Sequence, residues 1–252
     1  MEQTALRLAD ELNSIIDEAT FAEFPMLASY LESYSALDIH TMVRFGRWKE
    51  LLEVPLPKNK HLMLYRTACV HYARGLALAI HEDKNNEAMK EVERFDTYRY
   101  DPEAKERILH NNSVADLLAV DSVVMRGEIA YRQGNYEEAF TLLRKAVELQ
   151  DNLNYDEPWG KMQPVRHSLG GLLFEQGFVE EATKLFREDL KLHPKNPWSL
   201  LGLIRCLKST SGCCDSEEVA DLERQLREQQ SGKLVDFKVV VPCACCQTPA
   251  EN

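Results

Sequence analysis

The sequence lacks the features of several protein classes. No uninterrupted apolar run of about 18 residues occurs among its 252 residues, so we expect no transmembrane helix. The first stretch, Met1–Glu18, is acidic and amphipathic rather than basic and then apolar, so we expect no signal peptide. Glycine-rich phosphate loops, Gly-x-Ser-x-Gly and His-Glu-x-x-His are also missing. These absences predict a cytoplasmic protein that is not an enzyme and needs no cofactor.

An excess of positive charge is missing as well. Lysine and arginine total 30 against 41 aspartates and glutamates, which gives a formal net charge of -11. An acidic surface repels phosphate backbones and anionic lipid headgroups, so we expect neither nucleic acid nor a membrane as a partner. A basic peptide or protein is compatible with this charge, although acidity is also ordinary among cytosolic proteins.

We expect the seven cysteines to be reduced thiols rather than a full disulfide framework, because their number is odd and no secretion signal is expected. Cys243, Cys245 and Cys246 are soft ligands at short spacing and are weak candidates for a zinc or Cu(I) site. His71 or His40 would complete such a site if the tail folded back. Because no second Cys-x-x-Cys is present, a redox pair, lipidation or no role at all stay open.

A glycine-led motif recurs along the chain. Gly134–Ala139 and Gly177–Ala182 have the same pattern, and a small residue, Gly127 or Gly170, precedes each by the same interval. This spacing is typical of the tetratricopeptide repeat (TPR), a pair of antiparallel helices of about 34 residues. It predicts an all-α, right-handed α-α superhelical solenoid of about five hairpins with a short extended C-terminal tail.

The predicted organisation has three parts. Small residues are expected where the two helices of a hairpin touch, because larger side chains would hold the helix axes apart. The expected hairpins are Tyr34–Pro57, Leu64–Tyr98, Val120–Asp151, one beginning at Gln163, and one beginning at Trp198 whose second helix is Glu217–Gln229, with a capping helix at Thr4–Thr20. The predicted domains are residues 1–33 as an N-terminal capping region, 34–230 as the repeat array, and 231–252 as an extended, cysteine-containing tail.

The connection between the third and fourth hairpins is longer than a standard repeat allows. The surplus falls around Leu149–Gln163, where Pro158 and Gly160 forbid a continuous helix. Long loops within repeat arrays often carry function. Further on, Leu234–Pro242 is rich in β-branched residues and is expected to be extended.

Several blocks resemble a family of large TPR proteins found in bacteria and some lower eukaryotes. The blocks are Tyr155–Gly170, Asn196–Leu203, Val43–Trp48, His71–Gly75 and the Cys-x-Cys tail, and they cover nearly the whole chain. The resemblance implies that this chain corresponds to the C-terminal half of longer relatives. It supports the fold and implies little about activity, because members are described only as TPR proteins. Pro242 and Cys246 depart from the family pattern.

Candidate contact residues follow from the repeat register. The first helices of TPR hairpins line the concave surface, and polar residues on them can clamp an extended peptide. Around the long loop, carboxylates, a histidine, an arginine and a tryptophan gather in sequence. A purely solvated helix face and a purely structural loop are the alternatives. The predicted partner-binding residues are His40, Arg44, Asp121, Glu128, Arg132, Asp156, Glu157, Trp159, Arg166 and His167.

Two classes of function follow. The leading hypothesis is a protein-protein interaction scaffold that binds a peptide or protein partner in the concave TPR groove. The alternative is a small-ligand-binding, metal-binding or hydrolytic protein that uses the Asp156–His167 loop and the C-terminal cysteines. Self-association through the first units, or docking of a missing N-terminal half there, is a third possibility.

Overall fold

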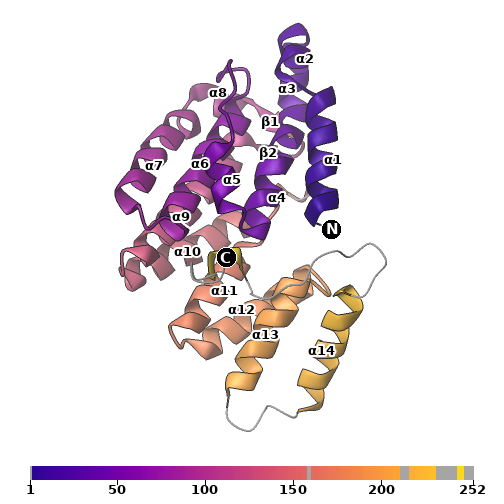
Figure 1. Cartoon of the computed structure of the whole chain (residues 1–252), viewed down its shortest axis with the longest axis vertical. Coiled ribbons are helices and arrows are strands. Elements are labelled where there is room, and N and C mark those ends of the chain that lie inside the picture. The colour runs from indigo at the N-terminus through magenta and orange to yellow at the C-terminus, as the bar shows by residue number, and fades with distance from the viewer. Residues whose placement is uncertain (1, 158–159, 211–215, 231–242, 247–252) are drawn as a thin grey trace. The chain divides into compact units, whose positions relative to one another are not determined.

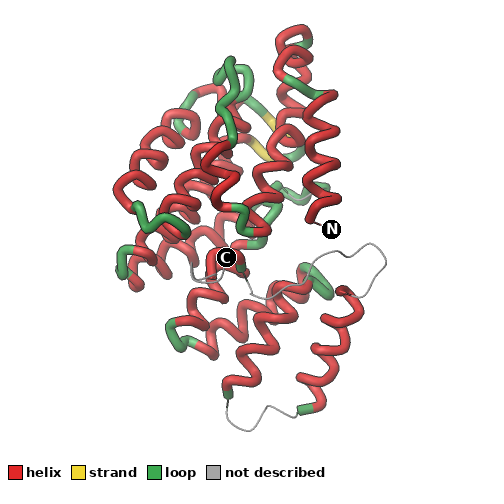
Figure 2. The backbone as a smooth tube through the Cα atoms, viewed as in Figure 1, coloured by secondary structure: helices red, strands yellow, loops and turns green. Residues whose placement is uncertain are grey.

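The computed structural model describes the whole chain except residues 1, 158–159, 211–215, 231–242 and 247–252. The described residues form an all-α repeat fold with one small pair of strands (Figures 1 and 2). The chain divides into two compact units, Thr4–Gln163 and Pro164–Asn252, the second including Met1–Gln3. Among the described residues, no helix is long and apolar enough to cross a membrane.

The N-terminal unit begins with short helices rather than the single helix expected over Thr4–Thr20. The cause is Asp17, whose carboxylate accepts a hydrogen bond from the Thr20 amide at 2.8 Å and starts a new helix. Pro25 starts the next helix differently, because a proline at the first helical position needs no amide hydrogen there. The elements here are α1 (Glu2–Ile15), α2 (Glu18–Glu23), α3 (Pro25–Leu31) and the 3-10 turn η1 (Glu32–Ala36).

The predicted hairpins of this unit form where the repeat pattern places them. Gly46 and Gly134 take the left-handed backbone conformation at two of the turns, with φ of 68° and 80°, which favours glycine. Helix α5 ends just before Pro55, as expected of a proline that cannot continue a helix. The pairs are α4 (Leu37–Phe45) with α5 (Trp48–Glu53), α6 (Leu64–Ile80) with α7 (Asn85–Arg99), and α9 (Val114–Arg132) with α10 (Tyr136–Asp151) (Figure 1).

The stretch between α7 and α9 was not predicted to have structure of its own. It contains a short helix α8 (Pro102–Glu106) and two antiparallel strands, β1 (Ile108–Leu109) and β2 (Asn112–Ser113). Ser113 ends the strand pair and caps α9, since its hydroxyl accepts a hydrogen bond from the Asp116 amide at 3.1 Å. Asn112 of β2 also bonds the long loop at Asn154.

The C-terminal unit holds the two remaining predicted hairpins. Phe186 explains the small residues at their crossings, because a Cβ on Gly170 would lie 2.8 Å from its ring and one on Gly202 would also collide with it. The extended run predicted over Leu234–Pro242 lies outside the described residues. The elements are α11 (Val165–Glu175), α12 (Val179–Leu192), α13 (Pro197–Ser209), α14 (Glu217–Gln230) and the 3-10 turn η2 (Ala244–Cys246).

Candidate functional site

The first helices of the N-terminal unit present a row of polar side chains on one face. Tyr65, Cys69 and Tyr72 follow one another on α6 at helical spacing, and all three are buried. His40 of α4 lies beside them, with its Nε2 atom 3.2 Å from the Tyr65 hydroxyl. Asp121 of α9 completes the row. We call these five residues the first-helix face.

This face is covered by the long loop of the same chain. We call residues 152–163 the covering segment. Lys161 forms an ion pair with Asp121, and its Nζ atom lies 4.5 Å from the centre of the Tyr72 ring. The Gln163 side chain donates a hydrogen bond of 2.8 Å to the His40 carbonyl. The covering segment therefore contacts the first helix of every hairpin described in this unit.

The strands β1 and β2 hold the other end of the covering segment. The Asn154 amide donates to the Asn112 side chain at 2.8 Å, and the Asn112 side chain donates back to the Asn154 carbonyl at 3.1 Å. Asn111 donates to the Tyr155 carbonyl at 2.8 Å. Gly160 lies so close to Leu117 that a Cβ would approach it to 2.9 Å. Tight packing and paired backbone groups thus fix the segment on both sides of residues 158–159.

The charges on this face are nearly removed from water. Asp121 is 1% exposed and Lys161 is 6% exposed. Burial raises the pKa of the Asp121 carboxyl, and Lys161 opposes that shift. The Asp121 Oδ2 atom has no hydrogen-bond partner among the described residues. Asp121 is therefore a buried acceptor that is only partly satisfied by the covering segment.

The other groups of the face are held neutral. Burial, followed by the charges of Lys161 and Arg66, lowers the pKa of His40 to about 3. Burial also raises the pKa of Cys69 well above its ordinary value, so this thiol does not ionise near neutral pH. A neutral imidazole and a protonated thiol can accept or donate hydrogen bonds, which suits recognition of a peptide.

Three further predicted contact residues lie in this unit. Glu128 is buried on α9, at 2% exposed. Arg132 is half-buried, and its guanidinium carbon lies 5.3 Å from the centre of the Tyr131 ring. Arg44 is half-buried on α4. Of the five predicted contact residues in the helices of this unit, His40 and Asp121 are the two for which a contact with the covering segment is described.

The described contacts of His167 lie between helices of its own unit, and its predicted role in partner binding stays a prediction. Its Nε2 atom lies 2.9 Å from Asp189 Oδ2, and the Ser199 hydroxyl donates to the same oxygen at 2.5 Å. His167 is 1% exposed, and its ring lies beside Asp189 of α12, which also bonds Ser199 of α13. Ser199 and His167 both bond the same oxygen of the Asp189 carboxylate, an arrangement that differs from the serine-to-histidine-to-carboxylate order of a nucleophilic triad. Arg166 is also buried, with Nε 3.8 Å from Glu188.

The acidic residues of the long loop serve local structure. Asp156 accepts hydrogen bonds from the Asn111 amide at 3.3 Å and from the Glu157 amide at 3.0 Å. Glu157 is exposed and accepts a hydrogen bond from the Tyr155 hydroxyl. Trp159 lies outside the described residues. These bonds give no specific support to hydrolysis, which stays an untested alternative.

The sequence analysis did not predict that Lys161 pairs with Asp121 on the first-helix face. Lys161 follows the acidic block of the long loop, and nothing in the repeat pattern marks it as a groove contact. The signal was indirect: Asp121 falls on a buried helix position, and a buried carboxylate needs a cation or donors.

The C-terminal cysteines form a compact turn. The sulfur atoms of Cys245 and Cys246 lie 3.9 Å apart, and the Cys245 amide donates to the Cys243 sulfur at 3.4 Å. Burial raises the pKa of Cys245 well above its ordinary value, which works against the thiolate that a metal requires. Among the residues that the structure describes, no group of three or more His, Cys, Asp or Glu is placed to hold a metal ion.

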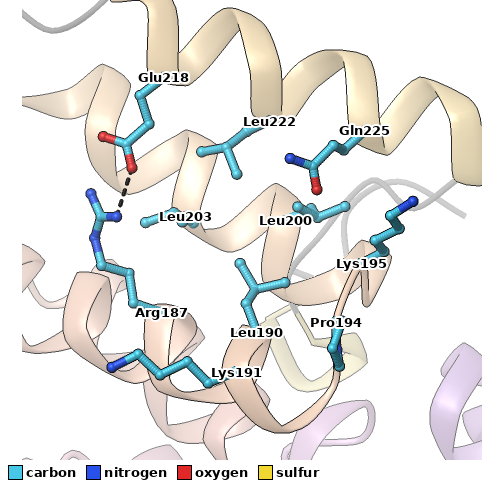
Figure 3. A pocket seen from close by; sticks show the side chains of 10 residues that line it. All are labelled: Arg187, Leu190, Lys191, Pro194, Lys195, Leu200, Leu203, Glu218, Leu222 and Gln225. Atoms are coloured by element: carbon cyan, nitrogen blue, oxygen red, sulfur yellow. Dashed lines mark ion pairs between the residues drawn. The ribbon is translucent and has the colours of Figure 1, made fainter.

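A cleft of about 470 Å³ opens between α12, α13 and α14 in the C-terminal unit (Figure 3). Leu200, Leu203 and Leu222 point into it, and these three leucines are already buried. An ion pair of 2.6 Å between Arg187 and Glu218 closes one end. The cleft therefore offers little uncovered apolar surface.

Comparison with known proteins supports the repeat and goes no further. Residues 122–153 match the tetratricopeptide repeat family, which covers most of α9 and all of α10. No curated protein and no solved structure matches the chain. The resemblance to large TPR proteins with a related long loop and a Cys-x-Cys tail stays a prediction.

Proposed function

We propose that this chain is a protein-interaction scaffold whose N-terminal unit binds an extended peptide of a partner protein on the first-helix face. A TPR is a repeat that commonly mediates protein interactions. The observation that carries the proposal is that this face already binds a non-helical segment of the same chain, the covering segment, through Lys161 and Gln163. A surface that binds one non-helical segment of its own chain offers contacts that a segment of a partner protein could replace.

The covering segment also indicates the chemistry of the partner. Asp121 offers a carboxylate oxygen without a hydrogen-bond partner, and Tyr72 offers a ring face to a cation. A lysine or arginine of a partner peptide fits this position. The net charge of -11 would speed the approach of such a basic peptide.

Not all predicted contact residues fit this proposal equally. His40 and Asp121 are buried and in contact with the covering segment, so a partner would reach them only after that segment has left, and Glu128 is buried as well. Arg44 and Arg132 are half-buried and are proposed as rim contacts. His167 and Arg166 are buried and bonded to Asp189 and Glu188, so the proposed binding face does not include them.

Affinity capture followed by mass spectrometry tests this function. The bait is the full chain in three forms: wild type, Lys161→Ala/Gln163→Ala, and the same double variant with Asp121→Asn added. We expect a partner that is enriched by the double variant, because the face is uncovered, and lost again when the Asp121 charge is removed. Lys145→Ala/Gln133→Ala, two exposed positions on or beside α10, is the matched control.

Circular dichroism confirms that each bait is folded before capture. A partner set that does not respond to uncovering the face, or responds equally to the control, would contradict the proposal. The captured peptide then gives the spacing of its basic residues directly.

A further inference from the structure

A cleft lies between residues 54–63 and the helices α6 and α7. His71 and Arg74 of α6 line it. The cleft has two adjoining parts of about 610 and 250 Å³, which share Lys60, Thr97 and Tyr98. We call this the cationic cleft.

One wall of the cationic cleft is an irregular stretch that is firmly held. The backbone amides of Lys58 and Asn59 both donate to the Glu18 carboxylate, the first at 3.0 Å. Arg107 donates to the Leu62 carbonyl at 2.8 Å, and Arg74 donates to the Val54 carbonyl at 2.7 Å. Because its backbone is anchored at several points, this wall is formed before any ligand arrives, which lowers the entropy cost of binding.

The other wall is a row of side chains from α6 and α7. His71 Nδ1 lies 2.6 Å from Glu91, which also bonds to Arg94. The Tyr98 ring stacks on His71 with centroids 5.8 Å apart. Glu91 is thereby engaged below the surface, while the Arg94 side chain stays 58% exposed. The wall offers a cation and an aromatic ring side by side.

Charge separates the cationic cleft from the rest of the molecule. The cleft is lined by four cationic side chains, Lys58 and Lys60 on one wall and Arg74 and Arg94 on the other. Among the lining residues that the structure describes, Asp101 is the one with a carboxylate. This local excess of cations occurs on a chain whose net charge is -11. Arg74 also lines the cleft, and among the described residues its buried Nε atom has no hydrogen-bond partner.

We propose that the cationic cleft binds a short, extended, carboxylate-rich segment of a partner protein. Cations on both walls suit acidic side chains that alternate along an extended chain, and Tyr98 and Leu56 provide apolar contact between them. A long nucleic acid or an anionic membrane would meet the surrounding acidic surface and be repelled, whereas a short peptide contacts the cleft alone. This inference does not depend on the first-helix face, because a different side of α6 carries it.

The test uses the full chain and a short fluorescein-labelled peptide in which glutamate alternates with serine around one central leucine. A peptide with glutamine in place of glutamate is the ligand control. We compare wild type with Lys58→Glu/Lys60→Glu and with Lys49→Glu/Lys90→Glu, which makes the same charge change at exposed lysines outside the cleft. Fluorescence anisotropy gives the affinities at low and physiological salt.

We expect the cleft variant to weaken binding of the acidic peptide about tenfold or more, and the control variant to change it about twofold or less. Arg94→Gln should act in the same direction without adding a negative charge. Equal weakening by both double variants, or no binding by wild type, would overturn the proposal. Tighter binding of single-stranded DNA or anionic vesicles, or self-association of wild type that the cleft variant abolishes, would reassign the occupant and also overturn it.

Discussion

The two units bury a carboxylate in different ways. Asp121 in the N-terminal unit meets a cation from outside the hairpins, Lys161, which lies 40 residues further along the chain. Asp189 in the C-terminal unit meets His167, Ser199 and His193, all on or next to the adjoining helices. Burial opposes ionisation at both sites, but the pKa is raised at Asp121, whereas the hydrogen bonds and charge of His167 lower it at Asp189.

This difference separates a structural site from one that can change. The partners of Asp189 are delivered by the repeat itself, so its hydrogen bonds persist as long as the hairpins are folded. The partner of Asp121 is delivered by the covering segment, and a carboxyl with a raised pKa can take up a proton when that partner leaves. We therefore expect that a partner peptide can replace the covering segment on the first-helix face without unfolding the unit. In contrast, loss of any hydrogen-bond partner of Asp189 should destabilise the C-terminal unit.

The largest effect is expected for Asp189→Ala, which tests whether the Asp189 cluster is needed for stability. The change leaves the buried His167 and Ser199 without their shared acceptor, and we expect it to lower the free energy of unfolding by about 3–5 kcal/mol. Urea denaturation followed by circular dichroism measures the loss. Glu180→Ala, at an exposed position of α12, is the control and should change stability by less than about 0.5 kcal/mol.

At the other site, Lys161→Met should cost less, about 2 kcal/mol, because Asp121 can bind a proton once the ammonium is gone. The double variant Lys161→Met/Asp121→Asn should recover part of the loss, since it removes the uncompensated charge. The same denaturation experiment gives both values. If the double variant is as unstable as the sum of the two single variants, the pair is not coupled and the comparison fails.

A pH series sharpens the account of the first-helix face. The pKa of His40 is lowered to about 3 from 6.5, so the unfolded chain binds a proton below pH 6.5 and the folded chain does not. The contribution of His40 to stability is therefore present above pH 6.5 and is lost as pH falls toward 3. His40→Asn should flatten this acid limb, by about 1–2 kcal/mol between pH 7 and pH 5.

The pH measurement is made as a difference between variant and wild type. Burial, opposed by Arg107, raises the pKa of Glu32 to about 7, so Glu32 contributes stability that is lost as pH rises through 7. This slope has the opposite sign and is common to both proteins. His61→Asn, at a side chain that is 81% exposed, serves as control and should leave the curve unchanged.

The smallest effects are expected at the glycine turns between the two helices of a hairpin, which both units contain. Gly134 and Gly177 have φ of 80° and 81°, and a Cβ at either would meet nothing within 4 Å. Gly134→Ala and Gly177→Ala should therefore each cost about 1 kcal/mol, from backbone strain without a clash. Thermal unfolding compares the two. A neutral result at one position would show that its turn relaxes, and the two units would then differ in local structure as well.

The hairpins were predictable because their signals are local. The Gly134 and Gly177 turns, the small residue Gly170 beneath Phe186 and the helix stop before Pro55 each follow from one residue and its near neighbours. The break at Asp17 was missed although it is also local, because an aspartate within an amphipathic pattern can either cap a helix or lie on its exposed side.

The TPR-like hairpins follow from the sequence alone, since helix period, turn glycines and small crossing residues act over a few positions. The pairing of the buried polar residues, Lys161 with Asp121 and His167 with Asp189, emerges only when the chain is folded. A buried charge must find a partner somewhere in the fold, and spacing along the chain does not say which distant segment will supply it.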